Sequence, residues 1–174
     1  MQRTEIRIAG LGGQGVVLAG QVLGRAAAYS GKNVVQTQSY GAEARGSGAK
    51  SEIIVSEDRI GFPMVRKCDV LIAMSQEAVE RNIEDLKGNG VLLVDNSIVE
   101  KIPETNAKVM KIPASKIAKE TVGEKLAANM VMLGALVTST AVVDTASIEK
   151  AISDVLSAKA KASNLQAFKI GLKI

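Results

Sequence analysis

The 174-residue sequence has no histidine and no tryptophan, and it has one cysteine, Cys68. The absence of histidine removes the commonest general base and an ordinary zinc site. One cysteine can form no internal disulfide and cannot hold an iron–sulfur cluster, and it fits a reducing compartment. Cys68 directly precedes an apolar run and has no histidine partner, so we interpret it as a core residue and not as a nucleophile. We therefore predict no metal site and no catalytic residue in this chain.

Aromatic residues are also scarce, at two Phe and two Tyr, and charge is nearly balanced, with 22 Lys and Arg against 18 Asp and Glu. There is neither a basic run nor an aromatic platform, so we expect no nucleic-acid partner. The longest apolar run, residues 130–143, is interrupted by three hydroxyl residues and is too short to span a membrane. No signal or leader pattern opens the sequence. We therefore expect a soluble cytoplasmic protein.

The most informative stretch is residues 5–20, EIRIAGLGGQGVVLAG. It predicts a Rossmann-like start, in which a short strand leads through a glycine turn into a helix. Gly10, Gly12 and Gly15 match the G-x-G-x-x-G pattern of nucleotide-binding turns. Glycines allow positive φ and the close approach of a ligand, and a helix N-terminus favours an anion. The turn residues that we expect to contact a ligand are Gly12, Gly13, Gln14 and Gly15.

Two common nucleotide sites fit this turn poorly. A dinucleotide site needs an acidic residue about 20 positions further on, at the end of the second strand, but residues 35–38 are Val-Gln-Thr-Gln. A P-loop needs Lys followed by Ser or Thr after its last glycine, where this chain has Val16 and Val17. The second mismatch excludes an ordinary kinase or ATPase site. The first leaves an NAD(P)-binding domain only as an alternative.

A second glycine-rich segment, residues 38–48, interrupts the periodic pattern of the chain. Binding residues gather on loops held by a rigid scaffold, so we expect this loop to be functional. Its candidate binding residues are Ser39, Tyr40, Gly41, Glu43, Arg45 and Gly46. A further candidate is Asn129, which lies in the apolar stretch 126–134. Asn129 either bonds to backbone inside the fold or contacts a ligand or subunit, and the sequence leaves both open.

Apolar periodicity and turn residues predict about six strands alternating with five or six helices. The predicted strands cover residues 3–9, 33–37, 50–56, 69–74, 90–95 and 107–112. The predicted helices cover residues 15–30, 75–86, 121–143 with a bend at Gly134, 146–156 and 160–168, with N-caps at Ser75 and at Asp144 or Thr145. The first strand, helix and second strand form a parallel crossover unit. The whole chain, residues 1–174, is thus expected to be a single three-layer α/β/α domain. Its sheet is mostly parallel, or mixed if the third strand is antiparallel.

Together, the two glycine-rich motifs resemble a known family. GLGGQGV at residues 10–16 and QTQSYGAEARG at residues 36–46 look like the gamma subunit of 2-oxoacid:ferredoxin oxidoreductases. The resemblance continues through residues 51–55, 69–77 and 129–134. It is greatest for the 2-oxoglutarate branch, while the pyruvate and branched-chain 2-oxoacid branches stay open. Ser47 departs from the pattern, because a second glycine would be expected directly after Gly46.

The resemblance implies an accessory subunit that is inactive alone and works with alpha, beta and delta-type subunits. Such a complex oxidatively decarboxylates a 2-oxoacid, forms the acyl-coenzyme A thioester and reduces ferredoxin. Thiamine diphosphate, magnesium and iron–sulfur clusters are then expected on partner subunits. Backbone N–H groups of residues 12–15 become candidates for a phosphate of coenzyme A, with Tyr40, Glu43 and Arg45 lining the same crevice or meeting a partner. A purely structural assembly role and a homodimer of the isolated chain also stay open.

Overall fold

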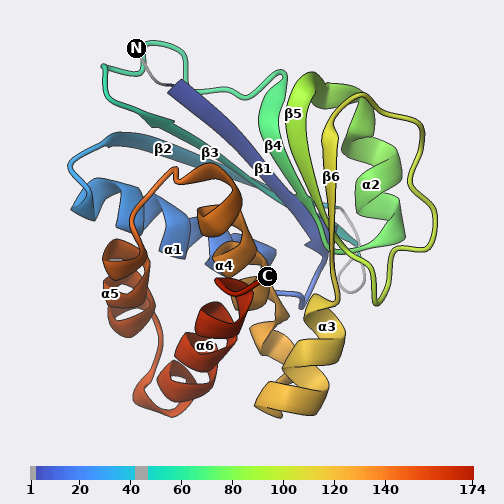
Figure 1. Cartoon of the computed structure of the whole chain (residues 1–174). Helices are drawn as coiled ribbons and strands as arrows, with labels where there is room; N and C mark the ends of the chain where they lie inside the picture. Colours follow the sequence, from blue (N-terminus) through green and yellow to red (C-terminus); the bar gives the residue numbers. More distant parts are fainter. Residues whose placement is uncertain (1–2, 42–46) are drawn as a thin grey trace.

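The computed structural model describes residues 3–41 and 47–174 and is built around one six-stranded sheet (Figure 1). The strands are β1 (Arg3–Leu11), β2 (Asn33–Tyr40), β3 (Gly48–Ser56), β4 (Cys68–Ala73), β5 (Leu86–Asp95) and β6 (Lys108–Ile112). The helices are α1 (Val16–Tyr29), α2 (Gln76–Asn82), α3 (Ala114–Ile117), α4 (Ala128–Thr140), α5 (Thr145–Val155) and α6 (Ala158–Gly171). Shorter 3-10 or π turns cover Ile83–Asp85, Ala118–Val122 and Lys125–Ala127.

The strand order is β2-β3-β1-β4-β5-β6, and the sheet is mixed. β3 runs antiparallel to both of its neighbours, while β1, β4, β5 and β6 are parallel. The expectation of a mixed sheet is therefore confirmed. The expected first crossover is altered, because β3 lies between β1 and β2. An antiparallel strand can return through a short loop, and here residues 41–47 are enough to bring β3 back beside β1.

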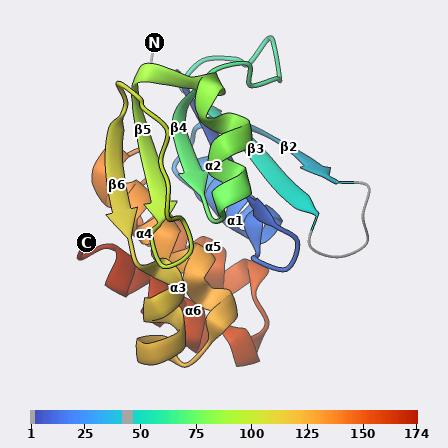
Figure 2. The ribbon, with the colours of Figure 1, turned by 90° about the vertical axis from the view of Figure 1, so that its right-hand side faces the viewer.

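Helices cover the two faces of the sheet unequally (Figures 1 and 2). One face, the four-helix face, carries α1, α4, α5 and α6, and its apolar cluster continues into Ile8 and Ile53 of the sheet. The other, the single-helix face, carries α2 and two connecting loops over a smaller cluster that includes Ile54 and Leu71. The predicted three layers are thus present. In the part of the chain that the structure describes, no helix is both long and apolar enough to cross a membrane.

Several local predictions are confirmed. Ser75 caps α2 by accepting a hydrogen bond from the N–H of Ala78, and Asp144 caps α5 by accepting one from the N–H of Ser147. The predicted end of the first helix at residue 30 is confirmed within one residue, because α1 ends at Tyr29 and Gly31 follows it with a φ of 73°. These features depend on a few neighbouring residues, so the sequence alone determines them.

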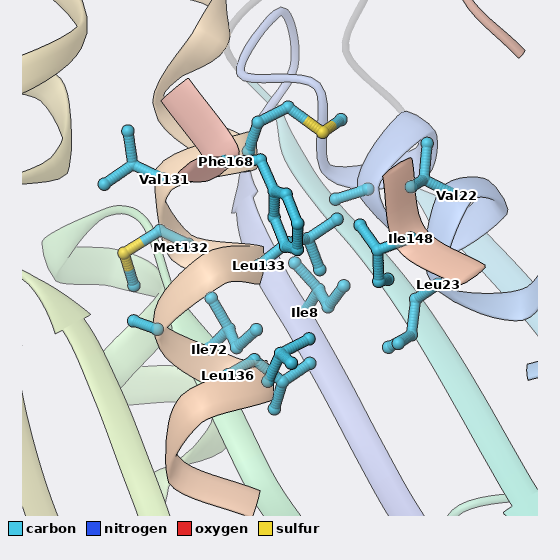
Figure 3. Packing of buried hydrophobic residues seen from close by; sticks show 14 of the residues in the cluster. Ile8, Val22, Leu23, Ile72, Val131, Met132, Leu133, Leu136, Ile148 and Phe168 are labelled. Carbon is cyan, nitrogen blue, oxygen red and sulfur yellow. The ribbon is translucent and has the colours of Figure 1, made fainter. Parts of the chain in front are cut away.

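The prediction differs most from the structure in the apolar stretch after residue 121. Within the expected helix 121–143, the α-helix is limited to α4, residues 128–140. Gly123 adopts a φ of 77°, which interrupts the helix before α4 begins. Gly134 lies within the continuous helix α4 and is where α4 meets α6, since a Cβ there would lie 2.4 Å from the carbonyl oxygen of Phe168. Figure 3 shows the Phe168 ring pointing into the cluster that it forms with Leu133 and Ile8.

Two smaller boundaries also differ from the prediction. α2 ends at Asn82 rather than near residue 86, and a 3-10 turn follows it. Residues 86–89, which precede the predicted strand 90–95, also belong to β5, where the pairing with β4 shifts register between Cys68 and Val70. Gly90 accommodates this irregularity, because a Cβ would lie 2.6 Å from the carbonyl oxygen of Asp69.

Candidate functional site

The glycine turn lies at the carboxyl end of β1 and leads into α1, as predicted. Gly13 and Gly15 have φ values of 91° and 72°, a region that favours glycine. Gly10 is needed for space, because a Cβ there would lie 2.5 Å from Oε1 of Gln14 and 3.2 Å from Cβ of Met74. The conformation of the turn itself therefore requires these glycines, whether or not a ligand binds.

The Gln14 side chain is used inside the fold. Its Oε1 accepts a hydrogen bond of 2.7 Å from the N–H of Leu11, and its Nε2 donates one of 2.7 Å to the carbonyl of Met74. The amide therefore links the turn to the end of β4. Each end of the amide keeps one further hydrogen-bonding position, so a ligand contact by Gln14 stays a prediction.

The backbone N–H groups of the turn divide into two pairs. Gly12 donates to the carbonyl of Ser47 at 2.9 Å, and Gln14 donates to that of Leu11 at 3.2 Å. For the N–H groups of Gly13 and Gly15, the described residues provide no acceptor. Gly15 caps α1 without a side-chain hydrogen bond, so the first turn of α1 also keeps open donors. Gly13, Gly15 and the start of α1 therefore form the part of the turn that suits an anion.

Asn129 lies against this turn from α4 and is 1% exposed. Its Nδ2 donates to the carbonyl of Gly15 at 2.9 Å, which is the backbone contact considered from the sequence. Its Oδ1 is buried and has no hydrogen-bond partner among the residues that the structure describes. The sequence could not indicate this contact, because residues 15 and 129 become neighbours only through the packing of α4 beside α1.

The second loop meets the first turn directly. Ser39 and Tyr40 end β2, and the N–H of Gly41 donates to the carbonyl of Gly48 at 2.8 Å. Ser47, at the other end of the loop, accepts the hydrogen bond from Gly12. The side chain of Tyr40 is 63% exposed. The remaining candidates in this loop, Glu43, Arg45 and Gly46, lie outside the described residues.

A cavity of about 300 Å³ opens beside the two motifs, on the single-helix face. The ends of β1 and β2 contribute Gly10, Ser39, Tyr40 and Gly41, so three of the predicted site residues line it together with a glycine of the first motif. The start of β3 contributes Lys50, and α2 contributes Glu77 and Arg81. No sequence pattern indicated Lys50 or Arg81 as site residues. The one signal for Arg81 was that α2 follows β4 directly, at the carboxyl end of the strands where β1 also ends.

Two cationic side chains, Lys50 and Arg81, lie at the rim of this cavity, and each is paired with a carboxylate. Arg81 pairs with Glu77 at 2.6 Å and remains 71% exposed, and Lys50 lies 3.5 Å from Glu52. Both cations can reach an anion in the cavity, because neither is buried in its ion pair.

Arg7 lies beneath the same region and is 3% exposed. It forms ion pairs with Glu52 at 2.7 Å and with Asp85 at 2.6 Å, and it donates to Oδ1 of Asn82. The hydrogen bond from Arg7 lowers the pKa of Asp85 from its ordinary value. Its donors are used within the fold, and the bond to Asn82 links Arg7 to a residue that lines the cavity.

Cys68 is fully buried at the start of β4, as predicted for a core residue. Burial raises the pKa of its thiol to about 11, so the thiol stays protonated at neutral pH. Within residues 3–41 and 47–174, no group of three or more Cys, Asp and Glu side chains is arranged to hold a metal ion.

The chain is similar to a known protein family and to relatives of known assignment. A family model described as pyruvate ferredoxin/flavodoxin oxidoreductase matches residues 5–174. The 2-oxoglutarate synthase subunit KorC of Methanocaldococcus jannaschii is 47% identical over 175 residues, which are 99% of this chain and 94% of that protein.

Two solved structures share the fold. The gamma subunit of a keto/oxoacid ferredoxin oxidoreductase from Geobacter sulfurreducens has a TM-score of 0.88 and 42% identity, over 98% of this chain and 96% of that one. The 2-oxoglutarate:ferredoxin oxidoreductase of Magnetococcus marinus, solved with 2-oxoglutarate, coenzyme A and succinyl-CoA bound, has a TM-score of 0.89 and 25% identity. That match covers 99% of this chain and 31% of the larger one.

Proposed function

The chain belongs to the pyruvate ferredoxin/flavodoxin oxidoreductase family, and from this we propose that it is the gamma subunit of a 2-oxoglutarate:ferredoxin oxidoreductase. The complex would oxidatively decarboxylate 2-oxoglutarate, transfer the succinyl group to coenzyme A and pass the electrons to ferredoxin. The choice of 2-oxoglutarate is supported by the 47% identity to KorC over nearly all of both chains. Alpha, beta and delta-type subunits are the proposed partners, in the cytoplasm.

We assign thiamine diphosphate, magnesium and the iron–sulfur clusters to those partner subunits. This chain has no histidine and one cysteine, so it lacks the thiolates that a cluster needs. Cys68 is buried and protonated. Bound in a partner, thiamine diphosphate would supply the stabilised carbanion of decarboxylation. The present chain would contribute shape, charge and orientation around the second substrate, coenzyme A.

The residues fit part of coenzyme A. The observation that carries this proposal is the 300 Å³ cavity with Lys50 and Arg81 at its rim, beside a turn whose Gly13 and Gly15 N–H groups are open. Cations and open N–H groups are the donors that bind phosphates. The exposed ring of Tyr40 lies at the same edge and offers a surface for the adenine.

The size of the cavity indicates a shared site. It lies at the lower end of the range of about 300–1,000 Å³ that is typical of small-molecule pockets. An extended ligand such as coenzyme A would therefore rest partly here and partly on another subunit. This is consistent with a subunit that is inactive by itself.

The test is a kinetic comparison in the reconstituted complex, with reduction of a viologen dye as readout. Replacing Lys50 and Arg81 together by Ala should raise the apparent KM for coenzyme A by about tenfold, because charge-assisted bonds to phosphate are lost. The KM for 2-oxoglutarate should not change. Lys108→Ala, at the far edge of the sheet, is the matched control and should leave both values unchanged.

Other outcomes would contradict the proposal in separate ways. An unchanged KM for coenzyme A in the double variant would leave this chain with a structural role only. Robust dye reduction by the isolated chain would contradict the accessory role. Binding of NAD but not of coenzyme A in calorimetry would favour a dehydrogenase-like domain.

A further inference from the structure

The open edge of β2 is the feature that the proposed function leaves unexplained. β2 pairs with β3 on one side, and none of the described residues forms a strand on its other side. The carbonyl of Gly48 accepts a hydrogen bond from the N–H of Gly41, so Gly48 directs its backbone groups toward β2. The carbonyl of Ser47 accepts one from the N–H of Gly12, so Ser47 directs its backbone groups toward β1. Even-numbered residues of β3 thus bond to β2, and odd-numbered ones to β1. Since the bonding direction alternates along an antiparallel strand, the β2 residues that direct their backbone groups outward are Val34, Gln36, Gln38 and Tyr40.

This edge lacks the usual protection against strand addition. Charged residues, proline, bulges or short length normally protect an edge strand. β2 is eight residues long, NVVQTQSY, with no charge and no proline, and its pairing with β3 has no register shift. The opposite edge, β6, is five residues long and carries Lys108 and Lys111. The difference indicates that β6 is built to stay unpaired and that β2 is not.

The outward groups of β2 are complementary to those of a second β2. If two copies run antiparallel about Thr37, Gln36 lies opposite Gln38 of the second copy, and Val34 lies opposite Tyr40. Every outward-facing residue then meets an outward-facing residue, and each pair can exchange two hydrogen bonds. No like charges are opposed, because the strand is uncharged.

Space for the added side chains is present beside the edge. An open groove of about 790 Å³ runs between α1, α5 and β2 and includes Val34 and Gln36. Gly24 and Ala28 of α1 also line it, and their small size leaves room over the edge. Gln36 faces this side of the sheet, since its Nε2 donates to Oγ of Ser51 beneath α1. Residues directly opposite each other in a ladder share a face, so alternate side chains of the second strand would enter the groove.

We propose that two copies of this chain pair through their β2 edges, antiparallel about Thr37, so that one sheet continues across both copies. The occupant of the groove is then the second copy's own strand. The pairing does not depend on which 2-oxoacid the complex uses, so the two proposals can fail separately.

The test is sedimentation of the full chain over a concentration series, comparing Gln38→Pro with Gln38→Ala. The N–H of Gln38 points outward, so proline should remove an intersubunit donor without breaking the bonds to β3. We expect the dimer dissociation constant to rise by about 10-fold or more in Gln38→Pro, since the bond is lost twice across the axis. Gln38→Ala keeps the N–H and should dimerise like the parent chain.

Hydrogen exchange gives a readout that needs no variant. In the parent chain the amides of Gln36 and Gln38 should become protected as concentration rises, while those of β6 should not change. Equal dimerisation of the Pro and Ala variants would overturn the proposal. So would a monomer at all concentrations whose β2 amides are protected only after partner subunits are added, an outcome that assigns the edge to a partner's strand.

Discussion

The two faces of the sheet are built from different chemistry. The four-helix face buries the larger apolar cluster together with polar side chains such as Asn129 and Ser147, and α4 and α6 approach so closely that Gly134 contacts backbone. The single-helix face buries Arg7 under α2 and keeps a cavity at its carboxyl edge. The comparison indicates that the first face supplies most of the stability, while the second accommodates a buried charge near the cavity where we propose that a ligand binds. Substitutions of different kinds can test this division.

The largest effect is expected from Phe168→Ala on the four-helix face. Phe168 is fully buried between α4, α6 and the sheet. Removing its ring should lower the free energy of unfolding by about 3–5 kcal/mol, because apolar burial is lost and a cavity remains. Urea unfolding followed by circular dichroism measures it. A loss below about 1 kcal/mol would show that this face does not dominate stability.

The next effect concerns helix packing and comes from Gly134→Ala. The new Cβ would overlap the carbonyl of Phe168, so α4 and α6 must separate. We expect a loss of about 2–3 kcal/mol in the same unfolding experiment. Gly24→Ala in α1 is the matched control, since its Cβ would meet nothing closer than 3.8 Å. Helix propensity should then make this control neutral or slightly stabilising, and equal losses in both variants would disprove the packing argument.

A smaller loss is expected from Arg7→Met on the single-helix face. The two carboxylates left behind are those of Glu52, with 15% of its side chain exposed, and Asp85, with 43% exposed. Because both can regain water, we expect a loss of about 1–2 kcal/mol, less than for a fully buried pair. A loss larger than that of Phe168→Ala would reverse the comparison between the faces. Thermal unfolding of the two variants side by side decides it.

The smallest effect on stability is expected at Asp144, the N-cap of α5, and it depends on pH. Asp144 accepts hydrogen bonds from Ser30, and from the hydroxyl and N–H of Ser147, and these lower its pKa to about 2. A depressed pKa stabilises the fold above the ordinary pKa of the carboxyl, and this contribution is lost as pH falls toward about 2. Asp144→Ala should cost about 1 kcal/mol at pH 7.

The control for this prediction is Asp144→Asn, which can still cap α5 but cannot titrate. Its melting temperature should therefore fall less than that of the parent chain between pH 4 and pH 2, a window set by the ordinary and lowered pKa of Asp144. Identical pH profiles for the two proteins would contradict the assignment. Melting temperatures measured across this range provide the check.

The features that could be predicted from the sequence are those with local causes. The turn at Gly13 and Gly15, the caps at Ser75 and Asp144 and the end of α1 at Gly31 each depend on a few adjacent residues. The long apolar helix was placed wrongly because apolar content alone does not reveal that Gly123 interrupts it. Residues 128–137 of α4 are all buried, so this helix has no polar face whose spacing could locate its first turn.

The site was only partly predictable, because its parts converge through strand order. The sequence indicated Ser39, Tyr40 and Gly41, and the structure places them at a cavity. Lys50 and Arg81 come to that cavity only because β3 inserts beside β1 and α2 follows β4. No spacing pattern encodes that insertion. The roles of the predicted residues in binding therefore stay predictions, to be decided by the kinetic test.

The hydrogen bond from Gly12 to Ser47 has a consequence for cooperativity. It joins the turn before α1 to Ser47, just before β3, so a change in the position of Gly12 relative to Ser47 must break or strain this bond. A ligand that prefers one arrangement of the turn must bias the loop by the same free energy, and a partner that holds the loop must bias the turn in return. If the turn binds a ligand and the loop meets a partner subunit, as proposed, this backbone contact would link assembly to substrate affinity.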